Sequence, residues 1–202
     1  APAGPHHNSQ DTTHISAMDG RGNTIALVHS AGGSFGAMVV SQSTGILQRN
    51  YTNLFNPEPG TRNSIGPWKR PLSHDSLTLV FKDGKPFMTI GAPGGRRVIT
   101  SVVQAIVNVI DFGLNMQDAV AAPRVHAEGS DPKFPEGLVD PNVIADTRYP
   151  ASVLDDLTRR GHRITLLPDG NFASPVAVMR DPATGELSSG LTVPTPALAV
   201  GV

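Results

Sequence analysis

The sequence predicts an α+β layered domain, and three patterns support this fold class. Two pairs of short strands flank tight turns, one long apolar stretch has helical spacing, and further short strands follow near the end of the chain. Strands, then helices, then strands again are typical of helices packed against a sheet. A length of 202 residues suits a single domain.

The first predicted element is a β-hairpin. Its strands, 13–18 and 24–28, flank the turn-forming sequence from Asp19 to Asn23. A third strand is expected from Ser34 to Val40. Residues 51–71 are rich in proline and glycine and are expected to form a long irregular loop that lines a site.

A second hairpin is predicted from 77–81 and 86–90, and its second strand continues into Gly91–Gly95. The periodicity then changes. From Val98 to Phe112 the apolar residues have the spacing of a helix that is buried on most sides. We therefore expect a helix N-terminus directly after the glycines.

The last third of the chain is expected to add one helix and three strands. The helix spans 151–160 and ends on Gly161 as its C-terminal cap. The strands lie near 162–167, 176–179 and 187–189. The proline-rich tail from Thr192 to Val202 is expected to run extended and to dock on a partner chain.

Composition excludes several classes of function. A formal net charge of −1 and a charged fraction of 16% provide no broad basic surface, so we expect neither a nucleic-acid nor a membrane partner. The absence of cysteine excludes a thiol nucleophile and thiolate metal ligation. His6 and His7 have no carboxylate neighbours at ligand spacing, so no metal or cofactor is expected. No apolar run reaches the ~20 residues of a membrane span, which predicts a soluble chain in an undetermined compartment.

Thr12 is the candidate nucleophile. A threonine hydroxyl is a poor nucleophile at neutral pH, but a threonine with a free α-amino group carries its own general base. We interpret residues 1–11 as a linker or precursor remnant and residues 12–202 as the catalytic domain. Cleavage of the Asp11–Thr12 bond would then create that amine. Position alone favours a threonine that merely begins a strand, because β-propensity already accounts for threonine there.

Two further features have residue types that suit this chemistry. Backbone N–H groups of Gly94 and Gly95, just ahead of a helix, are suited to stabilise an oxyanion, although such a pair is also an ordinary turn. His14 lies two residues after Thr12 and fits either a supporting role or simple packing.

Seven short segments, in this order and spacing, resemble the small subunit of the γ-glutamyltransferase family. They are Thr12-Thr13-His14, Asp19-Gly20-Arg21-Gly22-Asn23, Ser34-Phe35-Gly36, Thr44-Gly45-Ile46-Leu47, Lys69-Arg70-Pro71-Leu72-Ser73, Gly91-Ala92-Pro93-Gly94-Gly95 and Ala122-Pro123-Arg124-Val125-His126. The likeness runs from Thr12 to about Ser189 and leaves the eleven residues ahead of Thr12 outside. It implies the four-layer αββα fold of the N-terminal-nucleophile hydrolases, made as a precursor that cuts itself into two subunits. The partner would be the large subunit, in a heterodimer or a higher oligomer.

The same resemblance assigns roles to individual residues. Thr12 is the nucleophile, Ser30 supports it, and the backbone of Gly94 and Gly95 forms the oxyanion hole. Ser73 matches a family serine that contacts the substrate carboxylate.

The residues that hold a γ-glutamyl donor in the family are altered here. The family's asparagine, glutamate or glutamine, aspartate and second serine correspond to Gly32, Tyr51, Leu54 and His74. A substrate ammonium facing Leu54 would be unpaired, at a cost of about 2–5 kcal/mol of binding. Arg49 is a candidate partner for a substrate carboxylate, although an isolated arginine is more often a solvated surface residue.

These observations predict an amide-bond hydrolase or acyltransferase that forms a threonyl ester with an acyl group lacking a free α-ammonium. Its substrate would be a small-molecule amide. Two alternatives stay open. One is a true γ-glutamyltransferase whose donor contacts come from the large subunit or a shifted loop, and the other is a non-catalytic scaffold.

Overall fold

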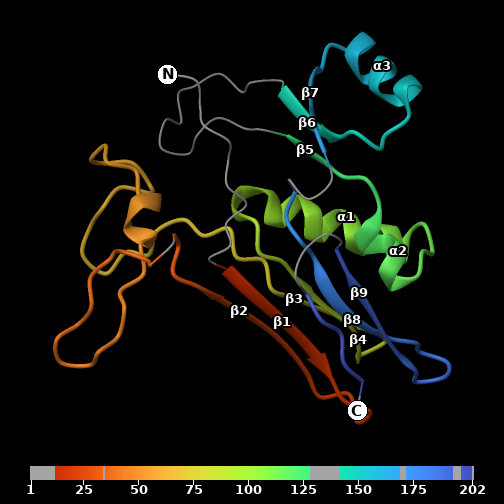
Figure 1. Ribbon diagram of the computed structural model, residues 1–202, viewed down its shortest axis with the longest axis horizontal. Helices are drawn as coiled ribbons and strands as arrows, with labels where there is room; N and C mark the ends of the chain where they lie inside the picture. The colour runs from red at the N-terminus through yellow and green to blue at the C-terminus, as the bar shows by residue number, and fades with distance from the viewer. Residues whose placement is uncertain (1–11, 34, 128–141, 169–171, 193–196, 202) are drawn as a thin grey trace.

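The computed structural model describes residues 12–33, 35–127, 142–168, 172–192 and 197–201. Figure 1 shows its strands and α-helices, and two short 3₁₀ helices accompany them. In chain order they are β1 (Thr12–Met18), β2 (Thr24–Ser30), η1 (Tyr51–Leu54), β3 (Thr78–Lys82), β4 (Lys85–Gly91), η2 (Gly95–Arg97), α1 (Val98–Ile110), α2 (Met116–Ala121), β5 (Val125–Ala127), β6 (Asn142–Asp146), α3 (Ala151–Arg159), β7 (Arg163–Leu167), β8 (Val176–Arg180) and β9 (Leu187–Leu191).

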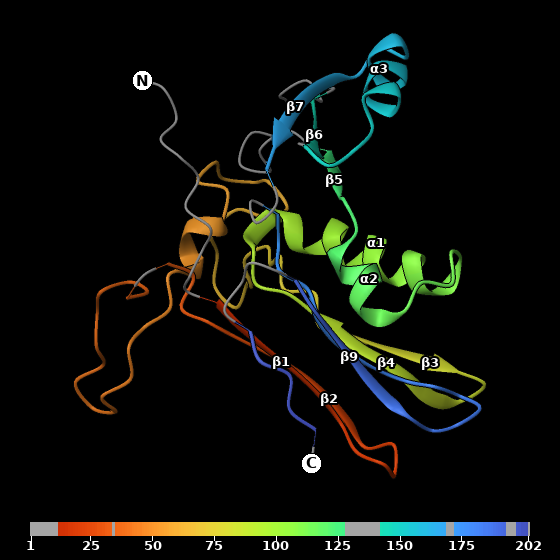
Figure 2. The same cartoon turned by 45° about the vertical axis from the view of Figure 1, so that its right-hand side comes forward.

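The described elements form layers, as predicted. The central sheet has the strand order β3-β4-β8-β9 with antiparallel neighbours, and β1 and β2 form a separate two-stranded sheet. Helices α1 and α2 cover one face of the central sheet, and the β1–β2 hairpin lies across its other face (Figures 1 and 2). This arrangement confirms the α+β fold class.

Strand β4 joins the layers because both of its faces are buried. Met88 and Ile90 are fully buried in the core with the helices, whereas Thr89 points the opposite way, since side chains alternate along a strand. The Thr89 hydroxyl donates to the Ile25 carbonyl of β2 at 2.9 Å. The hairpin is therefore fixed to the sheet that leads into the glycine turn.

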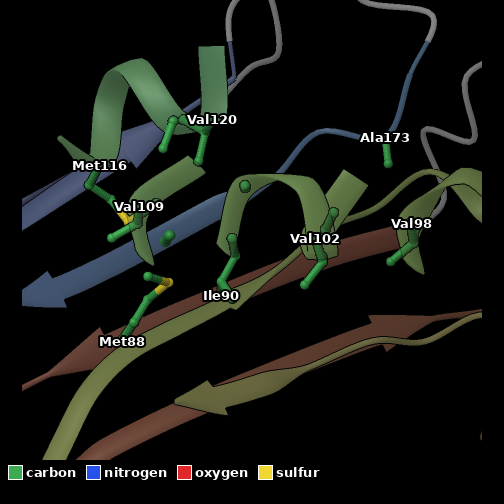
Figure 3. Packing of buried hydrophobic residues seen from close by; sticks show 12 residues of the cluster. Met88, Ile90, Val98, Val102, Val109, Met116, Val120 and Ala173 are labelled. Atoms are coloured by element: carbon green, nitrogen blue, oxygen red, sulfur yellow. The ribbon is translucent and has the colours of Figure 1, made fainter. Parts of the chain in front are cut away.

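The core lies between α1, α2 and the central sheet, as Figure 3 shows for the buried apolar side chains. Helix α1 contributes Val98, Val102, Ala105 and Val109, which recur at three- and four-residue intervals on one face. The helix was correctly predicted, but the expectation that it is buried on most sides is wrong for the described residues. Its other face leaves apolar side chains about half exposed, namely Ile99, Val103 and Ile110.

The first hairpin is confirmed, and its register places the two ends of the hairpin opposite each other. Thr12 pairs with Ser30, and the pairing continues to Met18 and Thr24 at the turn. In the turn the Asp19 carboxylate accepts the backbone N–H groups of Arg21 and Asn23. These bonds close the turn and hold the two strands in one register.

The strand expected at 34–40 is wrong for the residues that the structure describes. Phe35 and Met38 have φ angles of 60° and 57°, which a β-strand does not allow, and Val40 makes only an isolated bridge with Leu47. Ser34 lies outside the described residues. The glycines in and before this segment favour turns instead.

Residues 51–71 form the predicted irregular loop, with η1 as their only helical turn in the described chain. The second hairpin, the helix at 151 and the three late strands are confirmed by β3–β4, α3, β7, β8 and β9. Helix α2 and strands β5 and β6 were not predicted. Helix α2 has a plain signal in retrospect, because the Asn115 side chain caps it by accepting the Asp118 N–H at 2.9 Å.

The ends of the chain are described only in part. Residues 1–11, with His6 and His7, lie outside the described residues, as do 193–196 and 202. In the tail, 197–201 belong to neither a helix nor a strand. Within the described residues, no helix has the length and apolar character needed to cross a membrane.

Candidate active site

Thr12 begins β1 and faces Ser30 across the open end of the hairpin. Their hydroxyl oxygens are 2.9 Å apart. The Gly32 N–H donates to the Ser30 hydroxyl oxygen at 3.0 Å, which fixes that oxygen and leaves Ser30 its own proton to donate to Thr12. In that arrangement the Thr12 hydroxyl proton is available to a base.

Gly94 and Gly95 form the turn between β4 and the start of the α1 segment. Their φ angles are 142° and 61°, and the first of these is accessible only to glycine. A Cβ atom on Gly94 would lie 2.4 Å from Ala173 Cα. The Ser174 N–H donates to the Pro93 carbonyl at 3.0 Å, so the buried segment beside Ala173 is tied to the turn that it packs against.

A cavity beside Thr12 brings most of the predicted site residues together. Its walls come from the hairpin end, η1, the loop before β3 and the turn before α1. It is lined by Thr12, Ser30, Gly32, Tyr51, Asn53, Leu54, His74, Asp75, Ala92, Gly94, Gly95, Arg96 and Val98.

Gly32 and Tyr51 depend on each other sterically. A Cβ atom on Gly32 would lie 2.5 Å from Tyr51 Cδ1, and Gly32 has a φ of 83°. The aromatic ring thus occupies the space that a side chain at position 32 would need. With Leu54, it makes this side of the cavity largely apolar.

Two predicted substrate-binding residues do not line the cavity. The Arg49 guanidinium lies over the Tyr51 ring, 3.9 Å from its centroid. The Ser73 hydroxyl donates to the Asp75 carboxylate at 3.0 Å. Contact of either residue with a substrate remains a prediction.

Asp75 is the main cavity residue that the sequence analysis missed. Its carboxylate oxygens accept from the Tyr51 hydroxyl at 3.3 and 3.4 Å, in addition to the bond from Ser73. The available signal was a carboxylate two residues after Ser73, the serine that the family resemblance assigns to substrate binding. Asn53 and Arg96 were missed as well.

His74 is neutral in the cavity wall at pH 7. Burial lowers the pKa of His74, the positive charge of Arg96 lowers it further, and Asp75 opposes these effects. Arg96 and Asp75 therefore both act electrostatically on the same imidazole, which places a positive and a negative charge close to this wall.

His14 is buried behind Thr12 on the same face of β1. The Ser16 hydroxyl donates to the Val176 carbonyl at 3.2 Å, so the His14 Nε2–H must donate to Ser16 Oγ, 2.8 Å away. This assigns the tautomer and leaves Nδ1 with no hydrogen-bond partner among the described residues. Burial lowers the pKa of His14 from 6.5 to about 4, so the ring is neutral.

The geometry suits acyl transfer. The hydroxyl groups of Thr12 and Ser30 and a glycine turn ahead of a helix open onto one cavity. Such a turn offers backbone N–H groups where negative charge develops in a tetrahedral intermediate.

Comparisons with known proteins agree with this geometry. The family model described as Gamma-glutamyltranspeptidase matches residues 1–193. That match includes residues 1–11, which the sequence analysis left outside the resemblance. The glutathione hydrolase proenzyme of Escherichia coli (strain K12) is 42% identical over 130 residues, which are 59% of this chain and 22% of that protein. The acylase ACY 1 proenzyme of Pseudomonas sp. (strain V22) is 36% identical over 160 residues, covering 79% of this chain and 27% of that protein.

Solved structures show the same relationship. Helicobacter pylori gamma-glutamyltranspeptidase, as the T380A mutant, superposes with a TM-score of 0.76 at 31% identity, over 90% of this chain and 98% of that chain. Cephalosporin acylase from Bacillus halodurans gives a TM-score of 0.73 at 30% identity, over 89% of this chain and 32% of that one. The chain thus spans about a quarter of the length of the proenzymes that it matches.

Proposed function

Because the chain belongs to the gamma-glutamyltranspeptidase family, we propose that it is the nucleophile-bearing part of an enzyme that hydrolyses an amide bond or transfers its acyl group. One observation carries the proposal. The Thr12 hydroxyl, 2.9 Å from that of Ser30, opens onto the same cavity as Gly94 and Gly95.

The proposed reaction begins with cleavage of the Asp11–Thr12 bond, which gives Thr12 a free α-amino group. This amine removes the hydroxyl proton as Thr12 Oγ1 attacks the carbonyl carbon of the substrate amide. The Gly94–Gly95 backbone stabilises the oxyanion, and the protonated amine gives its proton to the leaving nitrogen. A threonyl ester remains. Water releases it as an acid, or an acceptor amine takes the acyl group.

We propose that the acyl group is not γ-glutamyl and lacks a free α-ammonium. The support comes from the apolar side of the cavity, where Leu54 and the Tyr51 ring offer no anionic partner for an ammonium. Relatives named as a glutathione hydrolase and as an acylase both match the chain, so the family does not impose one acyl group.

We further propose that a large subunit from the same precursor completes the protein. The relatives are named proenzymes, and the chain corresponds to about a quarter of each. The outer face of the hairpin also leaves apolar side chains about half exposed, namely Ile15, Ile25 and Leu27. Burial of that face by another layer would give the four-layer αββα sandwich.

A true γ-glutamyltransferase remains the second candidate, and Asp75 is the observation that favours it. This residue gives the cavity a carboxylate at a different position from Leu54. Release of a chromophore from a γ-glutamyl anilide and from the matching glutaryl anilide separates the candidates, because the two acyl groups differ only in the α-ammonium. Our proposal requires a higher kcat/KM for the glutaryl compound.

An intact-mass measurement of the full-length precursor tests the chemistry itself. We expect two chains after maturation, the smaller beginning at Thr12, and full activity only in the cleaved form. An uncut protein without amidase activity would favour the scaffold alternative. Full activity from a chain that still begins at Ala1 would contradict the role of the Thr12 amine.

A further inference from the structure

The cavity beside Thr12 contains an anionic wall that binds no cation of its own within the described residues. Asp75 lines the cavity, and its carboxylate is held from two sides by the hydroxyl groups of Tyr51 and Ser73. Two neutral donors orient the carboxylate but leave its negative charge in place. A second carboxylate brought to this wall would meet a like charge, which costs binding energy.

The hydroxyl of Ser73 is already engaged by this internal carboxylate. A serine has one hydroxyl proton, and here that proton is donated to Asp75 at 3.0 Å. The Asp75 backbone N–H also donates back to Ser73 Oγ at 3.2 Å. A substrate carboxylate would have to displace Asp75 to use this donor.

The remaining polar groups of the cavity include one cation, Arg96, and one neutral imidazole, His74. His74 is neutral at pH 7, and Arg96 and Asp75 act on it with opposite signs. Arg96 also takes part in interactions of its own. Leu54, Ala92 and Val98 supply apolar lining. A carboxylate-bearing acyl chain would lose its hydration here and meet the like charge of Asp75, whereas an uncharged chain would not.

We propose that Asp75 is a specificity-determining residue that excludes carboxylate-bearing acyl groups, so that the donor is an amide of a carboxylic acid without a second carboxylate. This inference rests on the proposed amidase function and narrows its substrate class. The inference concerns the charge at the end of the acyl chain that lies away from the amide bond.

Four anilides built on the same butanoyl chain test this inference. Butanoyl anilide carries no charge, glutaryl adds a carboxylate, 4-aminobutanoyl adds an ammonium, and γ-glutamyl adds both. With the mature two-subunit enzyme we expect butanoyl to exceed glutaryl in kcat/KM by about tenfold or more, the size expected for one like-charge contact in a partly exposed site. A glutaryl preference, as binding of its carboxylate by Arg96 would produce, overturns the proposal. A 4-aminobutanoyl rate above that of butanoyl supports the charge of Asp75 as the selecting group but contradicts the proposed function, in which the acyl group has no ammonium.

The variant Asp75→Asn keeps the shape and removes the charge. We expect it to raise the glutaryl-to-butanoyl ratio of kcat/KM about tenfold, because the like-charge contact is lost. Tyr51→Phe is the matched control, since it removes one hydrogen bond to Asp75 but keeps the ring and the charge, and the ratio should stay near that of the wild type. A ratio unmoved by Asp75→Asn overturns the role of its charge.

The experiment separates this inference from the function on which it rests. Hydrolysis that persists in Thr12→Ala would contradict the proposed mechanism. If hydrolysis depends on Thr12 but the glutaryl-to-butanoyl ratio of kcat/KM does not change in Asp75→Asn, only the proposed role of Asp75 is contradicted. If none of the four anilides is cleaved, calorimetric binding of butanoate and glutarate to the mature enzyme gives the same comparison, and tighter binding of glutarate overturns the inference.

Discussion

Replacing Gly94 with alanine should remove most of the catalytic rate while leaving the protein folded. The added Cβ would lie 2.4 Å from Ala173 Cα and 2.5 Å from Ala173 Cβ, and Gly94 has a φ of 142°. Contacts this short cannot be accommodated without movement of one backbone segment. Ala173 is fully buried, and the Ser174–Pro93 hydrogen bond ties the two segments together, so the glycine turn itself must shift.

A shift of the turn moves the backbone N–H groups away from the developing oxyanion. Loss of one such donor typically lowers kcat by about 10²–10³, equivalent to about 2.7–4 kcal/mol of transition-state stabilisation. The assay is steady-state hydrolysis of an anilide substrate by the mature enzyme, with maturation followed by intact mass. KM should change much less than kcat, because the oxyanion forms only during the reaction.

Two other glycines provide matched controls. Gly95 has a φ of 61° but nothing within 4 Å of an added Cβ, so Gly95→Ala meets only the backbone cost of about 1–2 kcal/mol and no collision. Gly20 lies in the hairpin turn with open space around it, so Gly20→Ala should be nearly neutral. Wild-type turnover by a folded Gly94→Ala enzyme, or a larger loss in Gly95→Ala, would refute the reasoning.

Three more predictions concern the nucleophile, the cavity and pH. Thr12→Ala should abolish both self-cleavage and turnover, whereas Ser30→Ala should cost only about 0.5–1.5 kcal/mol in kcat/KM, because it removes one supporting hydrogen bond; retained turnover in Thr12→Ala would contradict the mechanism. Leu54→Asp should raise the γ-glutamyl-to-glutaryl ratio of kcat/KM by restoring a partner for an ammonium, and an unchanged ratio in a variant that still matures would mean that this residue does not face the α-position. Because burial lowers the pKa of His14 from 6.5 to about 4, the unfolded chain binds this proton more readily than the folded protein, so the free energy of unfolding should decrease as the pH falls through that interval. Urea titrations of the wild type and His14→Gln should show a smaller decrease in the variant.

The sequence predicted those elements whose signal is local. The β1–β2 and β3–β4 hairpins have turn residues flanked by alternating strands, and α1 has a sustained helical period. The strand expected at 34–40 was wrong because the glycines in and before the segment favour turns over an extended strand. Strand β6 was missed because its partner β7 lies beyond α3, and such parallel pairing has no short-range signal.

The residues of the candidate site also divide into those with a signal in the sequence and those without one. Thr12 and the glycine pair were named from their own chemistry and Ser30 from the family resemblance, and they meet because the hairpin end and the turn after β4 adjoin. Asp75 was missed because its importance depends on the Tyr51 hydroxyl, 24 residues away in sequence. A contact between two loops cannot be read from either loop alone.

Through the hairpin register, the exposed turn at the far end of the hairpin determines the position of Thr12 relative to Ser30. Thr12 meets Ser30 only because every pair from the turn onwards is matched, and the turn is closed by the Asp19 carboxylate. A slip of one residue would point Thr12 to the opposite face of the strand. The turn lies about 20 Å from the nucleophile at the usual rise of a strand. Single-residue insertions or deletions there should therefore silence the enzyme as effectively as a change in the cavity, although they touch no residue that a substrate would meet.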